Sequence, residues 1–318
     1  MSSRETGPRN AVRIVEIDES SDGQRIDNFL LKNLKGVPKS KIYRCMRKGE
    51  VRVNGGRVKA STKLKIGDKV RIPPVRQSQS TTPKPSQKIT NILYKSIIYE
   101  DDMMLIINKP AGIAVHGGSG ISIGVIEALR ELRADDKSLE LVHRLDRDTS
   151  GCLMVAKKRS RLKNLQQLLN DKTRLEKHYL AIVHGRWPKR KQHINLPLRK
   201  NTLSSGERMS IVATDGKPSR TEIDVICQND EFSLLAVRPI TGRTHQIRVH
   251  CAHTGYPIVG DEKYGNEKKD KLLKKQGFGR LMLHASRLTI PASATGDKLI
   301  KVEAEAGDRF DNLVNTIK

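Results

Sequence analysis

Residues Leu141–Gly151 read LVHRLDRDTSG, which places a cluster of charged residues between two apolar runs. The run Leu139–Val142 begins on one side of the charges, and Cys152–Ala156 follows on the other. Such runs predict two buried strands joined by a charged loop. A charged side chain next to an apolar core destabilises the fold by several kcal/mol unless it forms an ion pair or binds a ligand. The loop is therefore either a surface turn held by an Arg–Asp pair or a functional site.

A second charged stretch, Gly242–Arg248, reads GRTHQIR and lies well downstream of the first. Thr244 is a residue type that caps helix N-termini, so we predict a helix that starts after it. His245 and Arg248 then lie on neighbouring turns. Further on, the lysine-rich residues Asn266–Gly279 predict an insertion that contributes nothing to the core.

The composition indicates a nucleic acid partner. The 318 residues include 60 Lys+Arg against 35 Asp+Glu, a formal net charge of +25, and a surface this positive attracts polyanions. Only 3% of the residues are aromatic, which favours recognition of a structured RNA through its backbone and shape over stacking on exposed bases. No apolar run reaches the roughly 18 residues of a membrane span, so we expect no membrane contact.

The sequence predicts neither a metal nor a cofactor. His245, His250 and His253 have no Cys or acidic residue at a spacing suited to zinc. Residues 116–120, HGGSG, lack the GK[ST] of a phosphate-binding loop and the GxGxxG of a dinucleotide fold. The four cysteines form no CxxC pair, and the N-terminus lacks the apolar segment of a secretory signal. We therefore expect a protein of the cytoplasm.

A small basic unit precedes the charged loop. Ile26, Phe29 and Leu30 recur at helical spacing, and Pro38–Ser40 opens a second helix. Val51–Gly55 is a short strand that enters an Asn-Gly turn. This pattern resembles the S4 RNA-binding domain. The resemblance and the density of positive charge predict that these residues bind RNA: Arg25, Arg44, Arg47, Lys48, Arg52 and Arg57.

The chain divides into four parts on composition. Residues 1–23 are an N-terminal segment, and residues 24–74 are the S4-like domain of α/β type. Residues 75–88 contain two prolines and almost no apolar side chains, so they predict a flexible linker. Residues 89–318 form the larger domain.

HRLDRDTSG together with GRTHQIR resembles the RluA family of pseudouridine synthases, over nearly the whole chain. The resemblance implies an α+β fold with a mixed, mainly antiparallel sheet and flanking helices. It implies an isomerase that needs no cofactor and converts specific uridines to pseudouridine. The phrases GVPKSKIYR and RKGEVRVN are most similar to family members that act on large-subunit (23S) ribosomal RNA.

The resemblance also assigns the site. The carboxylate that acts at C1′ of a flipped-out uridine falls on Asp146, not Asp148, and such chemistry calls for a carboxylate there. Arg248 matches its cationic partner, and Tyr179 matches the tyrosine that packs against the target base. Arg144 matches the residue that fills the space left by the flipped base. We assign Arg147 and Asp148 to the structure of the loop, and His143 and His245 to hydrogen-bonded core positions.

Two other functions stay open. One is a non-catalytic S4-type RNA-binding or ribosome-assembly protein, which the intact Asp146, Tyr179 and Arg248 argue against. The other is a hydrolase that uses Asp146 and Asp148 as paired carboxylates. A monomer that binds naked 23S RNA or an assembly intermediate is expected. A covalent adduct and elimination to a glycal are not distinguished.

Overall fold

The structure is a computed structural model that describes residues 11–34, 36–75, 85–117, 123–136, 138–171, 175–190, 192–202, 208–292 and 298–318. The chain forms two compact units, Met1–Pro83 and Lys84–Lys318. Most of the predicted linker and part of the HGGSG stretch lie outside the described residues. Gln87 and Lys88, assigned to the linker by composition, instead begin a helix.

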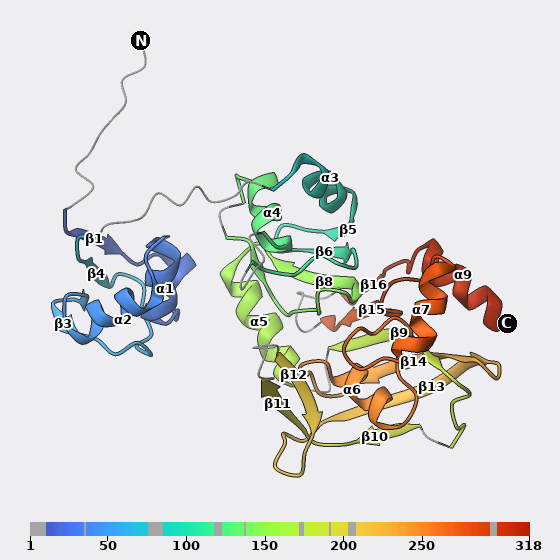
Figure 1. Ribbon diagram of the computed structural model, residues 1–318. Helices are drawn as coiled ribbons and strands as arrows, with labels where there is room; N and C mark the ends of the chain where they lie inside the picture. Colours follow the sequence, from blue (N-terminus) through green and yellow to red (C-terminus); the bar gives the residue numbers. More distant parts are fainter. Residues whose placement is uncertain are drawn as a thin grey trace. The chain divides into compact units, whose positions relative to one another are not determined.

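The small unit packs two helices against one antiparallel sheet (Figure 1). Its apolar core draws on both helices and on the strands. The sheet has the order β1-β4-β2-β3. The elements are β1 (Arg13–Glu16), α1 (Ile26–Asn33), α2 (Lys39–Arg47), β2 (Arg52–Val53), β3 (Gly56–Arg57) and β4 (Lys69–Ile72).

Strand β1 extends the sheet of this unit upstream of residue 24. Composition begins the S4-like domain at residue 24, but β1 pairs with β4 from Arg13↔Ile72 to Glu16↔Lys69. A strand hydrogen-bonded along its length to the sheet is part of the domain. The small unit therefore includes residues that the sequence assigned to a separate segment.

The larger unit is built on a mixed sheet with the order β10-β13-β14-β9-β15-β8-β6-β5, to which β7 and β16 add by pairing with β8 and β15. Its pairs are antiparallel except β15 with β8. The strands are β5 (Ile97–Glu100), β6 (Met104–Lys109), β7 (Glu140–Leu141), β8 (Ser150–Ala156), β9 (Glu176–His184), β10 (His193–Asn195), β13 (Arg220–Gln228), β14 (Phe232–Pro239), β15 (Leu283–Ile290) and β16 (Ile300–Glu303). A separate hairpin joins β11 (Leu198–Thr202) to β12 (Arg208–Val212).

Helices cover this sheet at both ends (Figure 1). The helices α3 and α4 contact each other and lie beside β5 and β6, whereas α6 contacts β12, β13 and β14. The α+β architecture implied by the sequence resemblance is confirmed. The helices are α3 (Gln87–Lys95), α4 (Val125–Leu132), α5 (Arg159–Asn170), α6 (Gln246–His253), α7 (Glu267–Lys275) and α9 (Asp308–Ile317).

The two apolar runs beside the charged loop are strands, as predicted. Strand β7 pairs with β8, and every residue of β8 is buried. Gly151 lies at a φ of +110°, and a Cβ atom there would be 2.2 Å from the carbonyl oxygen of Ala285. The glycine that ends the motif therefore allows the close approach of β8 to β15 that fixes one end of the loop.

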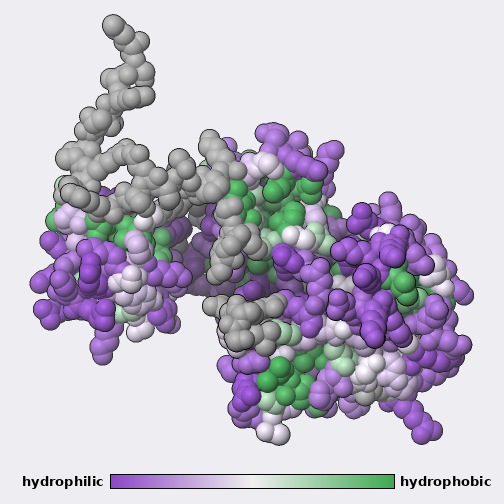
Figure 2. Space-filling model, in the orientation of Figure 1, coloured by the Kyte–Doolittle hydropathy of each residue, from purple (hydrophilic) through white to green (hydrophobic). Residues whose placement is uncertain are grey.

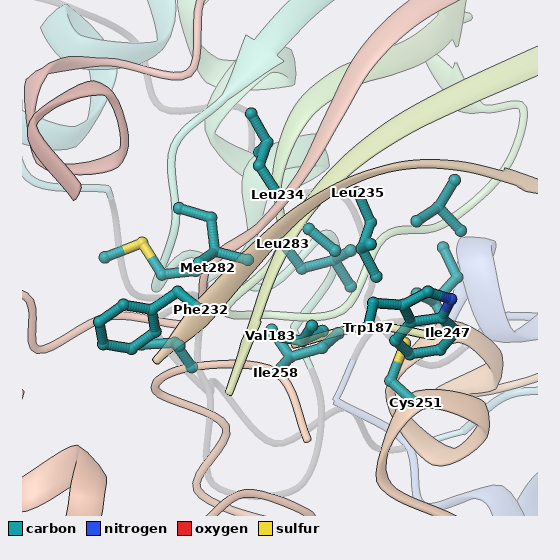
Figure 3. Close-up of a cluster of buried hydrophobic side chains, with 14 of the residues drawn as sticks. Val183, Trp187, Phe232, Leu234, Leu235, Ile247, Cys251, Ile258, Met282 and Leu283 are labelled. Carbon is teal, nitrogen blue, oxygen red and sulfur yellow. The ribbon is translucent and has the colours of Figure 1, made fainter. Parts of the chain in front are cut away.

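The main core of the larger unit lies between β9, β14, β15 and α6. Figure 3 shows Trp187, Ile247 and Cys251 gathered on one side of the cluster, with Phe232 and Met282 on the other. Burial of this apolar surface is the main force that holds α6 against the sheet. The core thus positions the helix that carries Arg248.

The lysine-rich segment is not the coreless insertion that its sequence suggests. It contains α7, whose Leu273 is buried in the main core. Asp270 accepts a hydrogen bond from the Gly260 backbone N–H at 2.9 Å and contacts His184 Nε2 at 2.8 Å. The helix is therefore anchored by one apolar and one acidic side chain that the surrounding lysines conceal in the sequence.

Candidate active site

A cavity of about 380 Å³ lies between the charged loop, the end of β14 and the start of α6. It belongs entirely to the larger unit. Asp146 is its one carboxylate among the described residues. The lining residues are His143, Arg144, Leu145, Asp146, Thr149, Leu169, Asn170, Lys177, Tyr179, Pro239, Ile240, Thr241, Gly242, Arg243, Thr244, His245, Gln246, Ile247, Arg248 and Leu283.

Asp146 is ion-paired with Arg248, a residue 102 positions later in the chain. Arg248 Nη1 donates to Asp146 Oδ2 at 3.1 Å. The Asp146 side chain is 21% exposed and the Arg248 side chain 4%, so the carboxylate faces the cavity and the cation lies behind it. The structure thus brings together the two residues that the family resemblance paired.

Asp261 holds Arg248 more firmly than Asp146 does, and the sequence analysis missed it. Arg248 Nε and Nη2 donate to the two oxygens of Asp261 at 2.8 and 2.6 Å, and the Asp261 side chain is fully buried. Burial alone lowers the pKa of Arg248, but the two carboxylates, Asp261 above all, raise it beyond its ordinary value. The one signal in the sequence is an aspartate directly after the apolar run Pro257–Gly260.

The turn before α6 differs from the prediction. The helix begins at Gln246, and Thr244 does not cap it. Gln246 Oε1 instead accepts the backbone N–H of Arg243 at 3.0 Å and the hydroxyl of Thr241 at 2.7 Å. The buried Gln246 side chain therefore holds the turn that leads into α6, while the first turn of the helix has no side-chain cap.

Tyr179 lies on β9 with its ring at the cavity wall, where β9 pairs with β14. Burial, together with the negative charge of Asp146, raises the pKa of Tyr179 well above its ordinary value. Its phenol therefore stays protonated at neutral pH. The structure places Tyr179 and Asp146 at the same cavity.

The two arginines of the loop have different surroundings. The Arg144 side chain is exposed at the cavity, and its guanidinium forms no hydrogen bond or ion pair within the described residues. Arg147 instead donates to both oxygens of Asp148, at 2.9 and 3.1 Å. Asp148 lines a different cavity from Asp146. The geometry therefore supplies no second carboxylate beside Asp146, which disfavours a hydrolase with paired carboxylates.

The two histidines that the sequence assigned to core positions also have different surroundings. Nε2 of His143 accepts the backbone N–H of Met154 at 3.1 Å, and burial, aided by Lys177, lowers the pKa of His143 to about 3. His143 is thus a neutral acceptor that ties the loop to β8. His245 lies instead at the cavity wall, with Nε2 3.8 Å from Asp146 Oδ1.

Lys109 is a buried cation beneath the loop that the sequence analysis also missed. Its Nζ donates to the carbonyl oxygens of Pro110, Ile113 and Arg147 at 2.7, 2.8 and 2.9 Å. Desolvation lowers the pKa of Lys109 to about 7, although the negative charges of Asp148 and Asp146 act to raise it. The lysine ties the end of β6 to the backbone of the charged loop.

The predicted RNA-binding residues of the small unit are all exposed. Arg44, Arg47 and Lys48 follow one another around the outer face of α2, opposite its buried residues. Arg52 and Arg57 face each other across β2 and β3. Like charges directly opposite in a sheet repel, so a bound polyanion would stabilise them. On the face drawn in Figure 2, hydrophilic residues cover most of the described surface of each unit.

Arg25 has a structural partner as well. Its guanidinium donates to the buried Asp27 at 3.1 and 2.6 Å, and Tyr43 donates to the same carboxylate at 3.0 Å. The hydrogen bonds from Arg25 are the main cause that lowers the pKa of Asp27. Arg25 therefore stabilises the fold of the small unit, whether or not it also contacts RNA.

Within the described residues, no cluster of three or more His, Cys, Asp or Glu side chains is placed to hold a metal ion. No helix in that part of the chain is long and apolar enough to cross a bilayer.

Comparison with known proteins identifies both units. A family model described as RNA pseudouridylate synthase matches residues 103–253, and one described as S4 domain matches residues 24–70. Ribosomal large subunit pseudouridine synthase C of Pasteurella multocida (strain Pm70) is 52% identical over 310 residues, which cover 97% of this chain and 94% of that protein. The protein of the same name from Escherichia coli (strain K12) is 50% identical over 312 residues, 97% of each chain.

Solved structures agree at the level of the fold. Human RNA Pseudouridylate Synthase Domain Containing 4 has a TM-score of 0.59 at 23% identity, covering 72% of this chain and 95% of its own. Human RNA Pseudouridylate Synthase Domain Containing 1 has a TM-score of 0.55 at 25% identity, covering 74% and 97%. With the site geometry and the two bacterial relatives, these matches show that the chain belongs to the RluA family of RNA pseudouridine synthases and carries an S4 domain.

Proposed function

We propose that this protein converts specific uridines of large-subunit (23S) ribosomal RNA to pseudouridine, with Asp146 acting at C1′ of a flipped-out uridine. In this isomerisation the N1–C1′ bond breaks and a C5–C1′ bond forms. The C5 hydrogen leaves as a proton, and N1 takes up a proton. The observation that carries the proposal is a single carboxylate facing a cavity, with one oxygen bound to a buried arginine.

Asp146 is suited to act at an electron-poor carbon. Its Oδ2 is held by Arg248, whereas Oδ1 faces the cavity with no recorded hydrogen bond in the described chain. The free oxygen can attack C1′ or stabilise positive charge that develops there. Both the covalent route and the glycal route use this oxygen.

Arg248 keeps the carboxylate both charged and oriented. Because Asp261 fixes two of its nitrogens in the interior, the guanidinium has little freedom to leave Asp146. A donor fixed in advance needs no reorganisation when charge moves during the reaction. Asp261 thus acts on Asp146 through Arg248 and is a positioning residue.

Tyr179 and Arg144 act on the base and on the gap that it leaves. A base inside folded RNA must leave its stack to reach a cavity of this kind. We assign Tyr179 to packing against the flipped uracil, with its phenol protonated. Arg144 is exposed and unengaged, and its planar guanidinium can stack and hydrogen-bond where the base was.

The S4 unit and the net charge of +25 support a large RNA as substrate. The large-subunit assignment rests on the names of the relatives that are about half identical over nearly the full chain. We propose that the protein acts as a monomer in the cytoplasm, on 23S RNA or on an assembly intermediate.

The test compares Asp146→Asn with Asp148→Asn, a matched change two residues away in a different cavity. The measurements are tritium release from rRNA that carries [5-³H]uridine, and RNA affinity. Asp146→Asn should abolish release while leaving affinity within about twofold. Asp148→Asn should release tritium at a rate within a few-fold of wild type.

Full turnover by Asp146→Asn would remove Asp146 from its role. The alternative function, a non-catalytic RNA-binding or assembly protein, predicts RNA binding without tritium release by the wild type. Mapping pseudouridines in total rRNA, with and without the gene for this protein, then identifies the modified uridines.

A further inference from the structure

His245 is directed at Asp146 by a hydrogen bond from the opposite side of its ring. Its side chain is 11% exposed, with Nε2 3.8 Å from Asp146 Oδ1. Nδ1 lies 2.8 Å from the hydroxyl of Tyr264, and the tyrosine ring contacts the imidazole edge-on. The imidazole therefore lies between a phenol on one side and the free oxygen of the carboxylate on the other.

The hydrogen bonds around Tyr264 decide which nitrogen of His245 carries the proton. The backbone N–H of Ser210 on β12 donates to the Tyr264 oxygen at 2.8 Å, which favours donation of the phenol proton to His245 Nδ1, and the nearby Asp146 carboxylate favours a proton on Nε2. Burial raises the pKa of Tyr264, which keeps that proton, and burial lowers the pKa of His245, which keeps the imidazole neutral. With Nδ1 accepting, Nε2 carries the hydrogen and points it toward the cavity.

The backbone at His245 is held in an unfavourable conformation. Its φ of 54° and ψ of 22° are left-handed, which is destabilising by about 1–2 kcal/mol for a residue other than glycine. The other residue of this kind among the described non-glycines is Asn54, in an Asn-Gly turn where asparagine is usual. Arg243 and Gln246 lock the turn on either side of His245. A glycine would relieve this strain but would remove the imidazole from the cavity.

Nε2–H of His245 and Oδ1 of Asp146 are a donor and an acceptor that form no hydrogen bond with any other described residue. A distance of 3.8 Å is too long for a direct hydrogen bond, but one oxygen atom can lie about 2.8 Å from both. The group that fits must accept from the imidazole and donate to the carboxylate, and a hydroxyl does both.

We propose that His245 and Asp146 together bind the 2′-hydroxyl of the target nucleotide. If Asp146 acts at C1′, as the proposed function holds, the hydroxyl on the adjacent carbon is the nearest ribose group able to bridge the two side chains. The 2′-hydroxyl accepts from His245 Nε2 and donates to Asp146 Oδ1, so it orients the sugar before reaction. His245 is thereby a determinant of ribose over deoxyribose at the reacting position.

The experiment is a double-mutant cycle between enzyme and substrate. An rRNA fragment with a uridine that the enzyme modifies is compared with the same fragment carrying 2′-deoxyuridine there, and kcat/KM is measured for each. The wild-type ratio contains every contribution of the hydroxyl, including its effect on the chemistry. The contribution of His245 is the factor by which this uridine-to-deoxyuridine ratio falls in His245→Asn. Asparagine is chosen because it tolerates the left-handed backbone, while its amide is too short to reach the 2′-hydroxyl.

A hydrogen bond of this kind contributes about 10- to 100-fold, so the uridine-to-deoxyuridine ratio should fall about that much in His245→Asn. Tyr264→Phe, which removes the phenol that fixes the tautomer, should lower the same ratio less. His253→Asn, an exposed histidine at the end of the same helix, should leave it unchanged.

An unchanged ratio in His245→Asn and in Tyr264→Phe overturns the inference, even if both variants turn over more slowly. Should His245→Asn fail to fold, Tyr264→Phe decides alone. A wild type that makes no pseudouridine from the uridine fragment would instead contradict the proposed function, so the two failures are distinguishable.

Discussion

Arg248 and Asp261 form a buried ion pair with two hydrogen bonds, at 2.8 and 2.6 Å, directly behind the carboxylate that faces the cavity. Asp261 also accepts the backbone N–H groups of Lys263 and Tyr264, at 2.9 and 3.1 Å. One buried side chain therefore fixes both the cation that binds Asp146 and the loop that carries Tyr264.

Asp261→Asn should lower both stability and turnover. Removing one partner of a buried ion pair is destabilising by up to about 3–5 kcal/mol, and here the buried Arg248 keeps only the partly exposed Asp146 as a counterion. A displaced Arg248 no longer orients Asp146, and small displacements of this kind reduce rates by roughly 100-fold. Urea unfolding and tritium release measure the two effects. Glu262→Gln, at an exposed neighbouring residue, is the control, and equal effects from both variants would contradict the prediction.

Arg144→Ala should separate activity from stability. The side chain is exposed and makes no recorded hydrogen bond or ion pair within the described chain, so the free energy of unfolding should change by less than about 0.5 kcal/mol. If Arg144 fills the gap left by the flipped base, single-turnover rates on structured rRNA should fall about 10- to 100-fold. Arg147→Ala, which removes the exposed pairs with Asp148 and Glu262, is the matched control. Comparable loss of activity in the two variants would argue against a special role for Arg144.

Lys109 should make stability depend on pH. The unfolded chain keeps a proton on this lysine up to its ordinary pKa of 10.5, whereas the folded chain releases it near pH 7. Between these values the unfolded state binds more protons, so stability rises with pH, by at most about 1.4 kcal/mol per pH unit from this group.

Lys109→Met should remove that dependence and leave three carbonyl oxygens without their donor, a loss of about 1–3 kcal/mol. The stability gap to the wild type should therefore widen from pH 7 to pH 9 in urea unfolding. Lys95→Met, at an exposed helix end, should follow the wild type. A constant gap would show that Lys109 stays charged in the folded state throughout this range.

Deletion of residues 1–83 should leave the remainder folded. The core of the small unit contains no residue of the larger one, and Ser86, which caps α3, is retained. RNA affinity should fall, and the logarithmic slope of its salt dependence should weaken by about 0.7–0.9 for each phosphate that the protein no longer binds. Circular dichroism and binding at several salt concentrations measure these effects. An unfolded remainder would show that the larger unit depends on the smaller one.

Local periodicity accounts for the elements that were predicted correctly. The strands beside the charged loop, β9 and the C-terminal helix all have apolar patterns that match their period. The predictions for α7 and for the start of α6 were wrong, because a few buried side chains set the structure there and the local composition does not reveal them. Asp270 and Leu273 anchor α7 among lysines, and the buried Gln246 holds the turn before α6, which Thr244 does not cap.

The positive charge and the two motifs can be read from the amino-acid sequence, and the family resemblance of those motifs implies the pairing of Asp146 with Arg248. The contacts of Asp261 with Arg248, and of His245 with the free oxygen of Asp146, become visible in the folded chain. The reason is that ion pairs and hydrogen bonds depend on distances of a few ångströms between atoms far apart in the chain. Those distances are set by how β8, β9, β14 and α6 pack around a shared core, which no local pattern records.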